Sequence, residues 1–295
     1  MGAQLEHLPA DLALARKAER LYGLISAVER AVVAFSGGVD SSLVAFVCGQ
    51  LLGRNAVAVT SGSASLKRSD LALTEQLATS WGLRHEVITT QELARPEYRA
   101  HPTNRCYYCK DTLFRALTSL ARREGIETIF SGTNLDDLGD HRPGLVAARE
   151  HQVRAPLAEA GFSKADIRAL AHHLGLANAD KPQSACLASR FPYGAAIDAE
   201  QLAQVEAAEA VLAEAGFTQF RVRHHGELAR LEVLLEELPL AMAQRSELDT
   251  ALKALGYRYV ALDLGGFQSG SMNRSLAASE RIAAVQLHDP VATGD

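Results

Sequence analysis

Short apolar runs alternate with amphipathic stretches along the first part of the chain. Four of the runs are expected to be strands of one sheet, at residues 31–35, 56–60, 86–88 and 128–130. The intervening stretches are expected to be helices, among them residues 11–30, residues 41–52 and a segment from a Ser69 cap to about Trp81. Strands that are buried on both faces read as continuous apolar runs, as in parallel sheets. The alternation therefore predicts an α/β fold, with a parallel sheet that is flanked by helices on both faces.

The pattern changes near residue 195. A helix over residues 198–215 is followed by the strand FRVRHH, a turn at Gly226-Glu227 and the strand LARLEVLL. Another helix over residues 239–254 and a last strand, YRYVALDL, complete the segment. This order, with its hairpin, predicts a smaller C-terminal α+β unit. We expect a first domain at residues 1–194 and a second at residues 195–295, which ends in a mobile tail after about residue 285.

The composition is that of a globular protein with an apolar core, because 47% of the residues are hydrophobic and 22% are charged. No run of about 18 apolar residues is present, and the first residues do not read as a signal peptide. We therefore expect a cytoplasmic protein without a membrane partner. The net charge of -5 gives no general attraction to nucleic acid. Because disulfides rarely persist in the cytoplasm, the four cysteines are interpreted as core residues, metal ligands or reactive thiols.

The sequence VVAFSGGVDSS, at residues 32–42, joins the end of an apolar strand to the start of a helix through two glycines. Backbone N–H groups in such a turn, together with the positive end of the helix, form an anion site. The loop lacks the GxxxxGK[ST] pattern of a Walker A loop. Asp40 would repel a polyphosphate unless a divalent cation lay between them, so it indicates Mg²⁺. Phosphate binding is predicted for Ser36, Gly37, Gly38, Val39, Asp40, Ser41 and Ser42.

SGGVDS resembles the signature of the PP-loop ATP pyrophosphatases. The resemblance implies an adenine-nucleotide hydrolase-like fold, cleavage of ATP between its α- and β-phosphates, and transfer of AMP to a carboxylate or carbonyl oxygen. SGTNLDD, at residues 131–137, resembles a second nucleotide loop of that family and follows a predicted strand, where open α/β sheets bind ligands. Taken alone, this segment reads equally well as an ordinary Asn/Asp turn. We expect the ATP site to include Thr60, Gly132, Asn134 and Asp136 as well.

Three cysteines are candidates for chemistry, whereas Cys48 lies in an apolar helix and is interpreted as a core residue. Cys106 and Cys109 form a CxxC motif within NRCYYCK, which we expect to lie in an irregular loop, and Cys186 lies in KPQSACLASR. A lone CxxC is compatible with a redox pair. With Cys186 it is compatible with a Cys₃His zinc site or with an iron–sulfur cluster held by three thiolates. The candidate zinc histidines are His85, His101 and His141.

A longer set of motifs resembles the LarE family of ATP-dependent sulfur transferases, over roughly residues 25–275. The motifs are HPTNRCYYCKDTLF, GTNLDDLGDHRPG, PLAEAGFSKADIRALAHHLGL, KPQSACLASRFPYG, FRVRHHGELARLEV and ALDLGGFQSGSMN. The resemblance implies that ATP adenylylates each carboxylate of pyridinium-3,5-biscarboxylic acid mononucleotide and that sulfur then displaces AMP to give thiocarboxylates. It also implies a place in nickel-pincer nucleotide biosynthesis, the route to the cofactor of lactate racemase.

The resemblance implies one of two sulfur sources, and both involve Cys186. In some members of the family the equivalent cysteine gives up its own sulfur once and is left as dehydroalanine. Other members have three cysteines and a 4Fe-4S cluster, whose extra sulfide is transferred. Because the chain also has Cys106 and Cys109, the resemblance implies the cluster type, with Cys106, Cys109 and Cys186 as ligands. The alternative is that Cys186 is sacrificial and that the CxxC motif is incidental or binds zinc.

The substrate carries a phosphate and two carboxylates, so its site requires cations. Arg190 follows Cys186 closely, and its guanidinium is suited to bidentate binding of an oxyanion. Arg221 and Arg223 alternate along a predicted strand and therefore share one face. By resemblance the substrate residues are Ser189, Arg190, Glu209, Arg221, Arg223 and Glu232, and further candidates are Lys110 and Arg142. The catalytic residues are expected to be Cys186, Asp40 and Arg190.

Three other functions compete with this interpretation. A tRNA thiolase can join a PP-loop to three cysteines, but it requires a basic surface, which this acidic chain does not indicate. An ammonia-using PP-loop ligase would need no cysteine triad, and a non-catalytic iron or zinc sensor would need no intact SGGVDS loop. The expected partners are the pyridinium mononucleotide, a sulfide donor or cysteine desulfurase, and further copies of the chain in a homo-oligomer, without nucleic acid.

Overall fold

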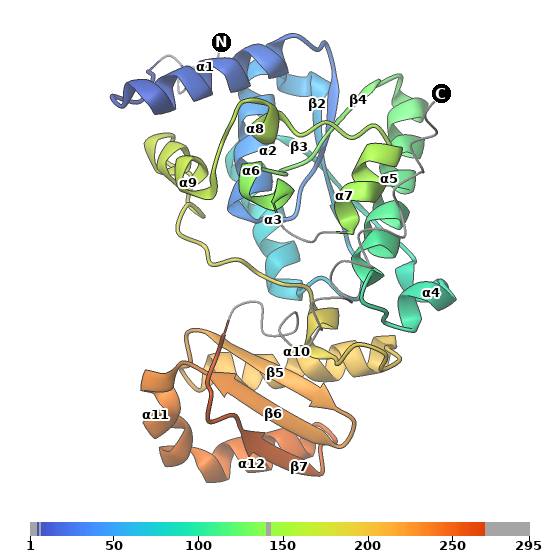
Figure 1. Cartoon of the computed structure of the whole chain (residues 1–295), viewed down its shortest axis with the longest axis vertical. Coiled ribbons are helices and arrows are strands. Elements are labelled where there is room, and N and C mark those ends of the chain that lie inside the picture. Colours follow the sequence, from blue (N-terminus) through green and yellow to red (C-terminus); the bar gives the residue numbers. More distant parts are fainter. Residues whose placement is uncertain (1–4, 6, 140–142, 269–295) are drawn as a thin grey trace, which may run out of the picture. The chain divides into compact units, whose positions relative to one another are not determined.

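The computed structural model describes residues 5, 7–139 and 143–268, and the chain divides into two compact units (Figure 1). The first comprises Met1–Glu92 and Asn104–Ser184, and the second comprises Leu93–Thr103 and Ala185–Asp295. His141, Arg142, the end of the ALDLGGFQSGSMN motif and the tail after residue 285 lie outside the described residues. No helix within the described residues is both long and apolar enough to cross a membrane. The assignment of a nucleotide domain to residues 1–194 and a substrate domain to residues 195–295 remains a prediction.

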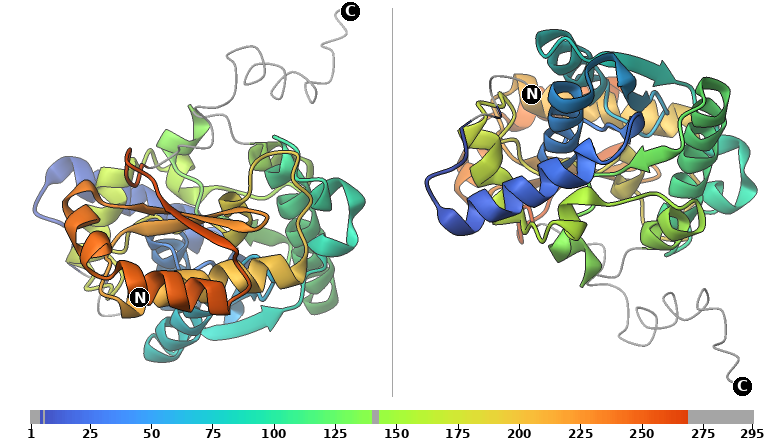
Figure 2. Two further views of the ribbon diagram at one scale, coloured as in Figure 1. Left: turned by 90° about the horizontal axis from the view of Figure 1, so that it is seen from below. Right: turned by 90° about the horizontal axis from the view of Figure 1, so that it is seen from above.

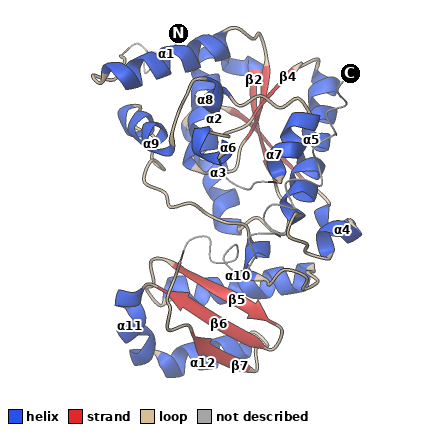
Figure 3. Ribbon diagram, in the orientation of Figure 1, coloured by secondary structure: helices blue, strands red, loops and turns tan. Residues whose placement is uncertain are grey.

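The first unit is built on a four-stranded parallel sheet, whose strands are red in Figure 3. Their order is β3-β2-β1-β4. The strands are β1 (Ala31–Ala34), β2 (Ala56–Ser61), β3 (Arg84–Ile88) and β4 (Thr128–Phe130). Ala31 pairs with Ala56 on one side and with Thr128 on the other. Each of the four predicted strands is present, and their parallel pairing confirms the predicted fold class.

Helices cover both faces of this sheet (Figure 2). Because side chains alternate along a strand, Val33 and Val32 point to opposite faces. The core around Val33 is formed with α1 (Leu12–Ser26), α2 (Val39–Leu52), α3 (Arg68–Ser80), α8 (Pro156–Glu159) and α9 (Lys164–His173). The core around Val32 is formed with α5 (Arg105–Glu124) and α7 (Gly144–Glu150). Short helical segments complete the unit: α6 (Leu135–Leu138) and the 3₁₀ turns Gly53–Asn55 and Glu92–Ala94, the latter at its border.

Two local predictions in the first unit are wrong. Helix α3 begins at Arg68 with Lys67 as its N-cap, so Ser69 lies in the first helical turn and does not cap the helix. The CxxC motif lies in the first two turns of α5 and not in an irregular loop, because the chain becomes helical directly after Asn104. The segment after β4 is more ordered than an Asn/Asp turn, since Asn134 caps α6 in a reciprocal capping box.

The second unit has a mixed three-stranded sheet in the order β5-β6-β7. The hairpin of β5 (Phe220–His225) and β6 (Leu228–Val233) is antiparallel, and β7 (Tyr259–Leu262) runs parallel to β6. Its helical segments are α4 (Pro96–Arg99), the 3₁₀ turns Leu187–Arg190 and Leu235–Glu237, α10 (Ala199–Glu214), α11 (Leu238–Ala243) and α12 (Arg245–Ala254). Side chains of α10, α11 and α12 pack with those of the sheet in one core. The predicted α+β order is confirmed, but the helix expected over residues 239–254 is divided into α11 and α12 at Gln244.

Candidate active site

The loop between β1 and α2 is held by its own backbone and serines. Residues 35–38 connect the strand to the helix, and together with the first residues of α2, as far as Ser42, they are called the nucleotide loop below. Ser41 Oγ donates to the carbonyl of Gly38 and accepts from the backbone N–H of Ser36, in each case over 3.1 Å. The first N–H groups of a helix have no partner within the helix, and α2 is 14 residues long. The loop therefore has the form that binds a phosphate at a helix N-terminus.

A glycine is required at position 37 for two reasons. The φ angle of +71° lies in the left-handed region, which is unfavourable for residues with a side chain. A Cβ on Gly37 would also lie 3.0 Å from Cγ2 of Thr74 and 3.5 Å from the backbone oxygen of Asp70. Both of these neighbours belong to α3, so the first turns of α3 pack directly against the loop.

The segment that follows β4 packs on the start of α2. A Cβ on Gly132 would lie 2.6 Å from the backbone nitrogen of Ser41 and 2.8 Å from its Cα. Asn134 is fully buried, and its Oδ1 accepts from two backbone N–H groups of α6. Its Nδ2 donates to Oδ2 of Asp40 over 3.4 Å. The structure therefore brings Asp40, Gly132 and Asn134 together, and their contacts with a nucleotide remain predictions.

Gly132→Ala is expected to disturb the nucleotide loop, because the neighbouring atoms are backbone atoms that cannot rotate away. Overpacking of this kind costs about 1–3 kcal/mol of the free energy of unfolding, and we expect weaker ATP binding with it. Gly139→Ala is the matched control, since a Cβ there meets no atom within 4 Å. Chemical denaturation and ATP titration of both variants measure the effect. Equal ATP affinities of the two variants would contradict the placement of Gly132 at the nucleotide site.

Three other predicted ATP residues use their side chains within the protein. Thr60 Oγ1 donates to a backbone carbonyl over 2.8 Å, so its 2.8 Å contact with His85 requires Nε2 of His85 to donate. Burial lowers the pKa of His85, which agrees with a neutral ring. Ser42 is fully buried and accepts from Nδ2 of Asn178 over 2.8 Å, and Asp136 accepts from the first backbone N–H of α9 over 2.7 Å. Nucleotide contacts of Thr60, Ser42 and Asp136 remain predictions.

Asn178 and Lys181 contact the nucleotide loop and are not among the residues predicted from the sequence. The carbonyl of Gly37 accepts from Nδ2 of Asn178 over 3.1 Å and from Nζ of Lys181 over 3.2 Å. Lys181 also forms an ion pair with Asp70 over 2.7 Å. Both residues follow α9, far from the loop in sequence. The sequence offered one indication for Lys181, because it lies in the motif KPQSAC, five residues before the candidate residue Cys186.

Cys106 lies in the first turn of α5, a helix of 20 residues, and Cys109 lies at the start of the second turn. Residues three apart share one helix face, so the two thiols face the same side. Cys106 is exposed and Cys109 is half-buried. The buried Arg105 donates from Nη2 to Sγ of Cys106 over 3.7 Å. Cys48 differs, because it is fully buried and burial raises the pKa of its thiol, as expected for a core residue.

In the second unit, Arg190 holds the turn that carries Cys186. Its guanidinium forms a bidentate ion pair with Glu209 at 2.7 and 3.0 Å, and the two side chains are 3% and 5% exposed. Its Nη1 donates to the carbonyls of Ala185 and Cys186 over 2.8 and 3.1 Å, and to Oγ of Ser189 over 2.9 Å. The N–H groups of Arg190 were expected to bind an oxyanion. In the structure they bind the backbone next to and at Cys186 and so position this residue. Direct contact of Arg190 with a substrate remains a prediction.

A second buried ion pair adjoins the first. Arg223 is bidentate to Glu232, with both distances at 2.9 Å, and its Nη1 donates to the carbonyl of Ser189 over 2.6 Å. Arg230 also donates to Glu232 over 3.0 Å. Glu209 accepts from the backbone N–H of Val222 over 3.2 Å, which ties the first pair to the same strand. The network thus gathers five of the predicted substrate residues: Ser189, Arg190, Glu209, Arg223 and Glu232.

The side chain of Arg221, the sixth predicted substrate residue, forms no hydrogen bond or ion pair with the described residues. It is 8% exposed, and its guanidinium lies 5.0 Å from the ring centre of Phe267. Burial, and then the neighbouring Arg223 and Arg190, lower the pKa of Arg221 to about 10. Three buried arginines face two buried glutamates here. This face therefore carries a positive charge that a bound anion would neutralise.

The candidate zinc ligands do not form a metal site in the part of the chain that the structure describes. No His, Cys, Asp or Glu side chains there are gathered in a group of three or more as metal ligands, so a cluster on Cys106, Cys109 and Cys186 remains a prediction. His85 contacts Thr60. His101 is fully buried, stacks on Tyr193 and contacts the carbonyl of Pro192 through Nδ1. A zinc site that uses either of these histidines is therefore not supported.

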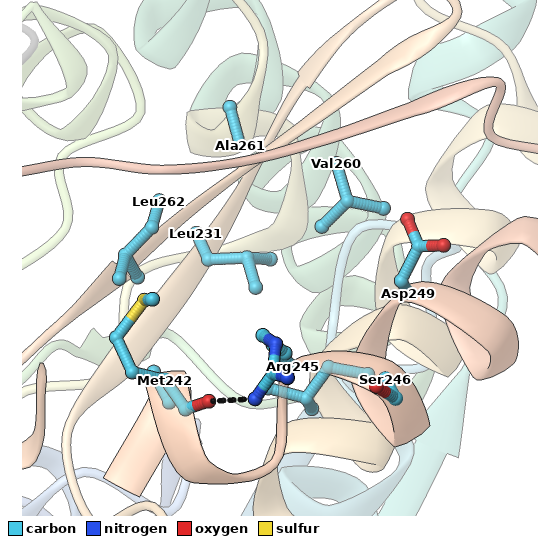
Figure 4. Close-up of a pocket in the computed structure, with 10 residues that line it drawn as sticks. Leu231, Met242, Arg245, Ser246, Asp249, Val260, Ala261 and Leu262 are labelled. Atoms are coloured by element: carbon cyan, nitrogen blue, oxygen red, sulfur yellow. Dashed lines mark hydrogen bonds between the residues drawn. The ribbon is translucent and has the colours of Figure 1, made fainter. Parts of the chain in front are cut away.

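A cavity of about 370 Å³ lies between β6, β7, α11 and α12 of the second unit (Figure 4). Its lining includes the apolar side chains of Leu231, Val260 and Leu262. Arg245 also lines it and donates to the carbonyl of Met242 over 3.3 Å. None of the predicted site residues is among its lining residues, so we do not assign this cavity to the active site.

Comparisons with known proteins match both the nucleotide loop and most of the chain. The NAD synthase family matches residues 24–105, which include the loop. The uncharacterized protein slr1717 of Synechocystis sp. is 44% identical over 89% of this chain and 99% of its own. The tRNA-specific 2-thiouridylase MnmA of Azorhizobium caulinodans is 32% identical, but over 55% of this chain and 51% of its own. The pyridinium-3,5-bisthiocarboxylic acid mononucleotide synthase of Lactiplantibacillus plantarum is 37% identical over 90% of this chain and 97% of its own. The chain therefore belongs to the family of pyridinium-3,5-bisthiocarboxylic acid mononucleotide synthases.

Proposed function

We propose that this enzyme uses ATP to convert the carboxylates of pyridinium-3,5-biscarboxylic acid mononucleotide into thiocarboxylates. One structural observation carries the proposal: the buried Arg–Glu network is hydrogen-bonded to the turn of Cys186, through Arg190 and through the Ser189 carbonyl. An anionic substrate that neutralised this network would lie beside the sulfur of Cys186. The family relationship supports the same reaction, because the similar synthase is named for a bisthiocarboxylic acid mononucleotide.

ATP is needed because a carboxylate oxygen is a poor leaving group. In the first step a carboxylate oxygen of the substrate attacks the α-phosphorus of ATP, and the bond from that phosphorus to the bridging oxygen breaks to release pyrophosphate. In the second step sulfur attacks the acyl carbon, the bond from carbon to the AMP oxygen breaks, and a thiocarboxylate remains. The loop around Gly37 would hold the phosphates at the N-terminus of α2. Asp40 would hold Mg²⁺, which neutralises phosphate charge during the transfer.

The second unit would bind the phosphate of the mononucleotide. Arg221 supplies a charge that the buried glutamates do not neutralise, and Arg223 adjoins it on the same face of β5. The side chains of Arg190 and Arg223 donate to backbone carbonyls in the turn of Cys186. These hydrogen bonds would fix the distance between the bound phosphate and the sulfur of Cys186 within this unit. Positioning of this kind supplies much of the rate in group-transfer reactions.

For the sulfur source, we infer that Cys106, Cys109 and Cys186 hold a 4Fe-4S cluster. The thiols of Cys106 and Cys109 fit such a group, because they share one helix face and Arg105 donates an N–H to the first of them. Hydrogen bonds to ligand sulfurs are a regular feature of iron–sulfur sites. When bound, a cluster with three protein ligands supplies a labile sulfide at its fourth iron. The alternative source is the sulfur of Cys186 itself.

Metal analysis of protein purified without oxygen tests the sulfur source. Iron, acid-labile sulfide, zinc and the absorption spectrum are measured in the wild type and in Cys106→Ala, Cys109→Ala and Cys186→Ala. Cys48→Ala is the matched control, because Cys48 is a core cysteine. We expect iron and sulfide in the wild type and in the control, and their loss in the other three variants. A metal-free wild type whose Cys186 loses the mass of one H₂S during the reaction would overturn the cluster and identify Cys186 as sacrificial.

Product analysis separates this function from tRNA thiolation, the second candidate, which the partial match to MnmA favours. The enzyme is given ATP with either the pyridinium mononucleotide or tRNA, and AMP, pyrophosphate and sulfur incorporation are measured. We expect thiocarboxylate formation and no thiolated tRNA. Tight ATP binding without pyrophosphate release on either substrate would contradict an enzyme and favour a metal sensor.

We also propose that the enzyme acts as a homo-oligomer and that a sulfide donor or cysteine desulfurase restores the sulfur. The product would then enter nickel-pincer nucleotide biosynthesis and serve the maturation of lactate racemase or a related nickel enzyme. Light scattering on the purified protein tests the assembly. The dependence of repeated turnovers on added sulfide tests the supply of sulfur.

A further inference from the structure

The nucleotide loop contains no cation of its own. Between Ser36 and Ser42 the charged residue is Asp40, whose charge has the same sign as that of a phosphate. Walker A loops bind polyphosphates with a lysine from within the loop. Here Lys181 brings an ammonium group to the loop from another part of the chain, and its Nζ donates to the carbonyl of Gly37 over 3.2 Å.

The ammonium group of Lys181 retains a donor for a ligand. A lysine has three N–H donors. Within the described residues Lys181 donates to the Gly37 carbonyl and to Oδ1 of Asp70, the latter over 2.7 Å. Its side chain is 19% exposed, so a small ligand can reach the remaining donor. A Cβ on Gly37 would lie 3.8 Å from Nζ, which places the ammonium group at the surface of the loop.

The position of Lys181 is fixed at its side chain and at its backbone. Asp70, in the first turn of α3, accepts from Lys181 on one carboxylate oxygen and from Oγ of Ser184 on the other, both over 2.7 Å. Arg168 of α9 donates to the backbone carbonyl of Lys181 over 3.0 Å. Because these contacts restrain both the side chain and the backbone of Lys181, little conformational freedom is left for it to lose when a ligand binds.

We propose that Lys181 binds the pyrophosphate part of ATP. The inference rests on the proposed function, because it places ATP at this loop. When the substrate carboxylate attacks the α-phosphorus, the bond from that phosphorus to the bridging oxygen breaks, and its electron pair stays on the departing pyrophosphate. Lys181 stabilises this growing negative charge through a charge-assisted hydrogen bond, and no proton has to be transferred.

A lysine–aspartate pair can also serve the fold alone, and the chain offers a control for that role. Lys17 of α1 and Asp166 of α9 form a similar pair in the first unit, at 2.5 Å and with side chains that are 25% and 23% exposed. Lys17→Met therefore removes a similar ion pair that joins α1 to α9 and does not contact the nucleotide loop.

Equilibrium binding of ATP, AMP and inorganic pyrophosphate, each with Mg²⁺, tests the proposal on the full chain. Lys181→Met is expected to bind ATP and pyrophosphate roughly tenfold or more weakly than the wild type, because it loses one hydrogen bond from a charged donor. It is expected to bind AMP as the wild type does. Lys181→Arg keeps the charge, so it should weaken the binding of ATP and pyrophosphate less than Lys181→Met does and leave AMP binding unchanged. This variant tests the proposal if Lys181→Met does not fold. Lys17→Met should bind all three ligands like the wild type.

The possible failures are distinguishable. A wild type that binds neither ATP nor pyrophosphate would overturn the proposed function together with this inference. A wild type that binds both, with Lys181→Met indistinguishable from Lys17→Met, would overturn the role of Lys181 alone. An equal loss of AMP, ATP and pyrophosphate in Lys181→Met and Lys181→Arg would show that Lys181 supports the fold of the loop, and it would also overturn the proposal.

Discussion

Asp40→Asn is expected to lower the rate of AMP and pyrophosphate formation by roughly 10²- to 10³-fold, the usual loss when one well-placed electrostatic contact to a transition state is removed. Asp40 stands in the first turn of α2, and its carboxylate accepts from Nδ2 of Asn134. A carboxylate at a polyphosphate site is favourable when it holds a cation such as Mg²⁺. Asparagine keeps the size of the side chain and an acceptor for Asn134, but it removes the charge that we propose holds Mg²⁺. Initial rates measured over a range of Mg²⁺ concentrations show the loss.

Asp11→Asn is the matched control for this experiment. Asp11 also stands at a helix start in the first unit, where it caps α1 by accepting from two backbone N–H groups. Asparagine is about as good an N-cap as aspartate, so the control should keep both stability and activity. If Asp40→Asn retained the rate of the control at every Mg²⁺ concentration, the assignment of Asp40 to the metal would be wrong.

The two central strands of the first unit, β1 and β2, could be predicted because they are buried on both faces. Val32 and Val33 belong to different cores, yet both must be apolar, so the strand reads as an uninterrupted run. Helix starts were harder to predict, because they depend on backbone angles. Ser69 is a suitable residue type for a cap, but Lys67 has the extended conformation that an N-cap requires. The expected irregular loop is present before the CxxC motif, but it ends at Asn104.

The nucleotide loop could be predicted because all of its turn lies in consecutive residues, SGGVDS. The contact of Lys181 with Gly37 could not be predicted, because the two residues are far apart in the sequence and meet only in the folded chain. The sequence likewise identifies Arg190 as a cation near Cys186, but it does not reveal that Glu209 neutralises Arg190 in a buried pair. Residue type indicates what a side chain can bind, whereas burial and pairing decide what it does bind, and these are tertiary properties.

Glu232→Ala is expected to lower the free energy of unfolding by about 3–5 kcal/mol, the usual cost of removing one partner of a buried ion pair. Glu232 is 2% exposed and accepts from Arg223 and Arg230. Its removal leaves buried positive charge without compensation. Glu227→Ala is the matched control, because the pair of Glu227 with Arg258 is exposed and should contribute less than about 1 kcal/mol. Urea denaturation compares the two variants, and equal stabilities would contradict the buried network.

Arg221→Met is expected to change stability in the opposite direction. Burial, and then the neighbouring arginines, lower the pKa of Arg221 to about 10, so at neutral pH the folded protein holds a charge that its surroundings disfavour. The unfolded chain has no such penalty, and we expect Arg221→Met to raise the free energy of unfolding by roughly 1–3 kcal/mol at neutral pH. The gain should shrink as the pH rises above about 10, because folded wild-type protein then releases this proton before the unfolded chain does.

Urea denaturation across this pH range, with inorganic phosphate titrated at neutral pH, measures both consequences of Arg221→Met. Wild-type protein should gain stability from phosphate, because a bound anion stabilises the state that binds it. The variant should be more stable without phosphate and should gain less from it. A less stable Arg221→Met at neutral pH would contradict the unfavourable charge. If Arg221→Met is more stable than the wild type and phosphate no longer stabilises it, the charge of Arg221 serves anion binding and lowers the free energy of unfolding of the protein without the anion.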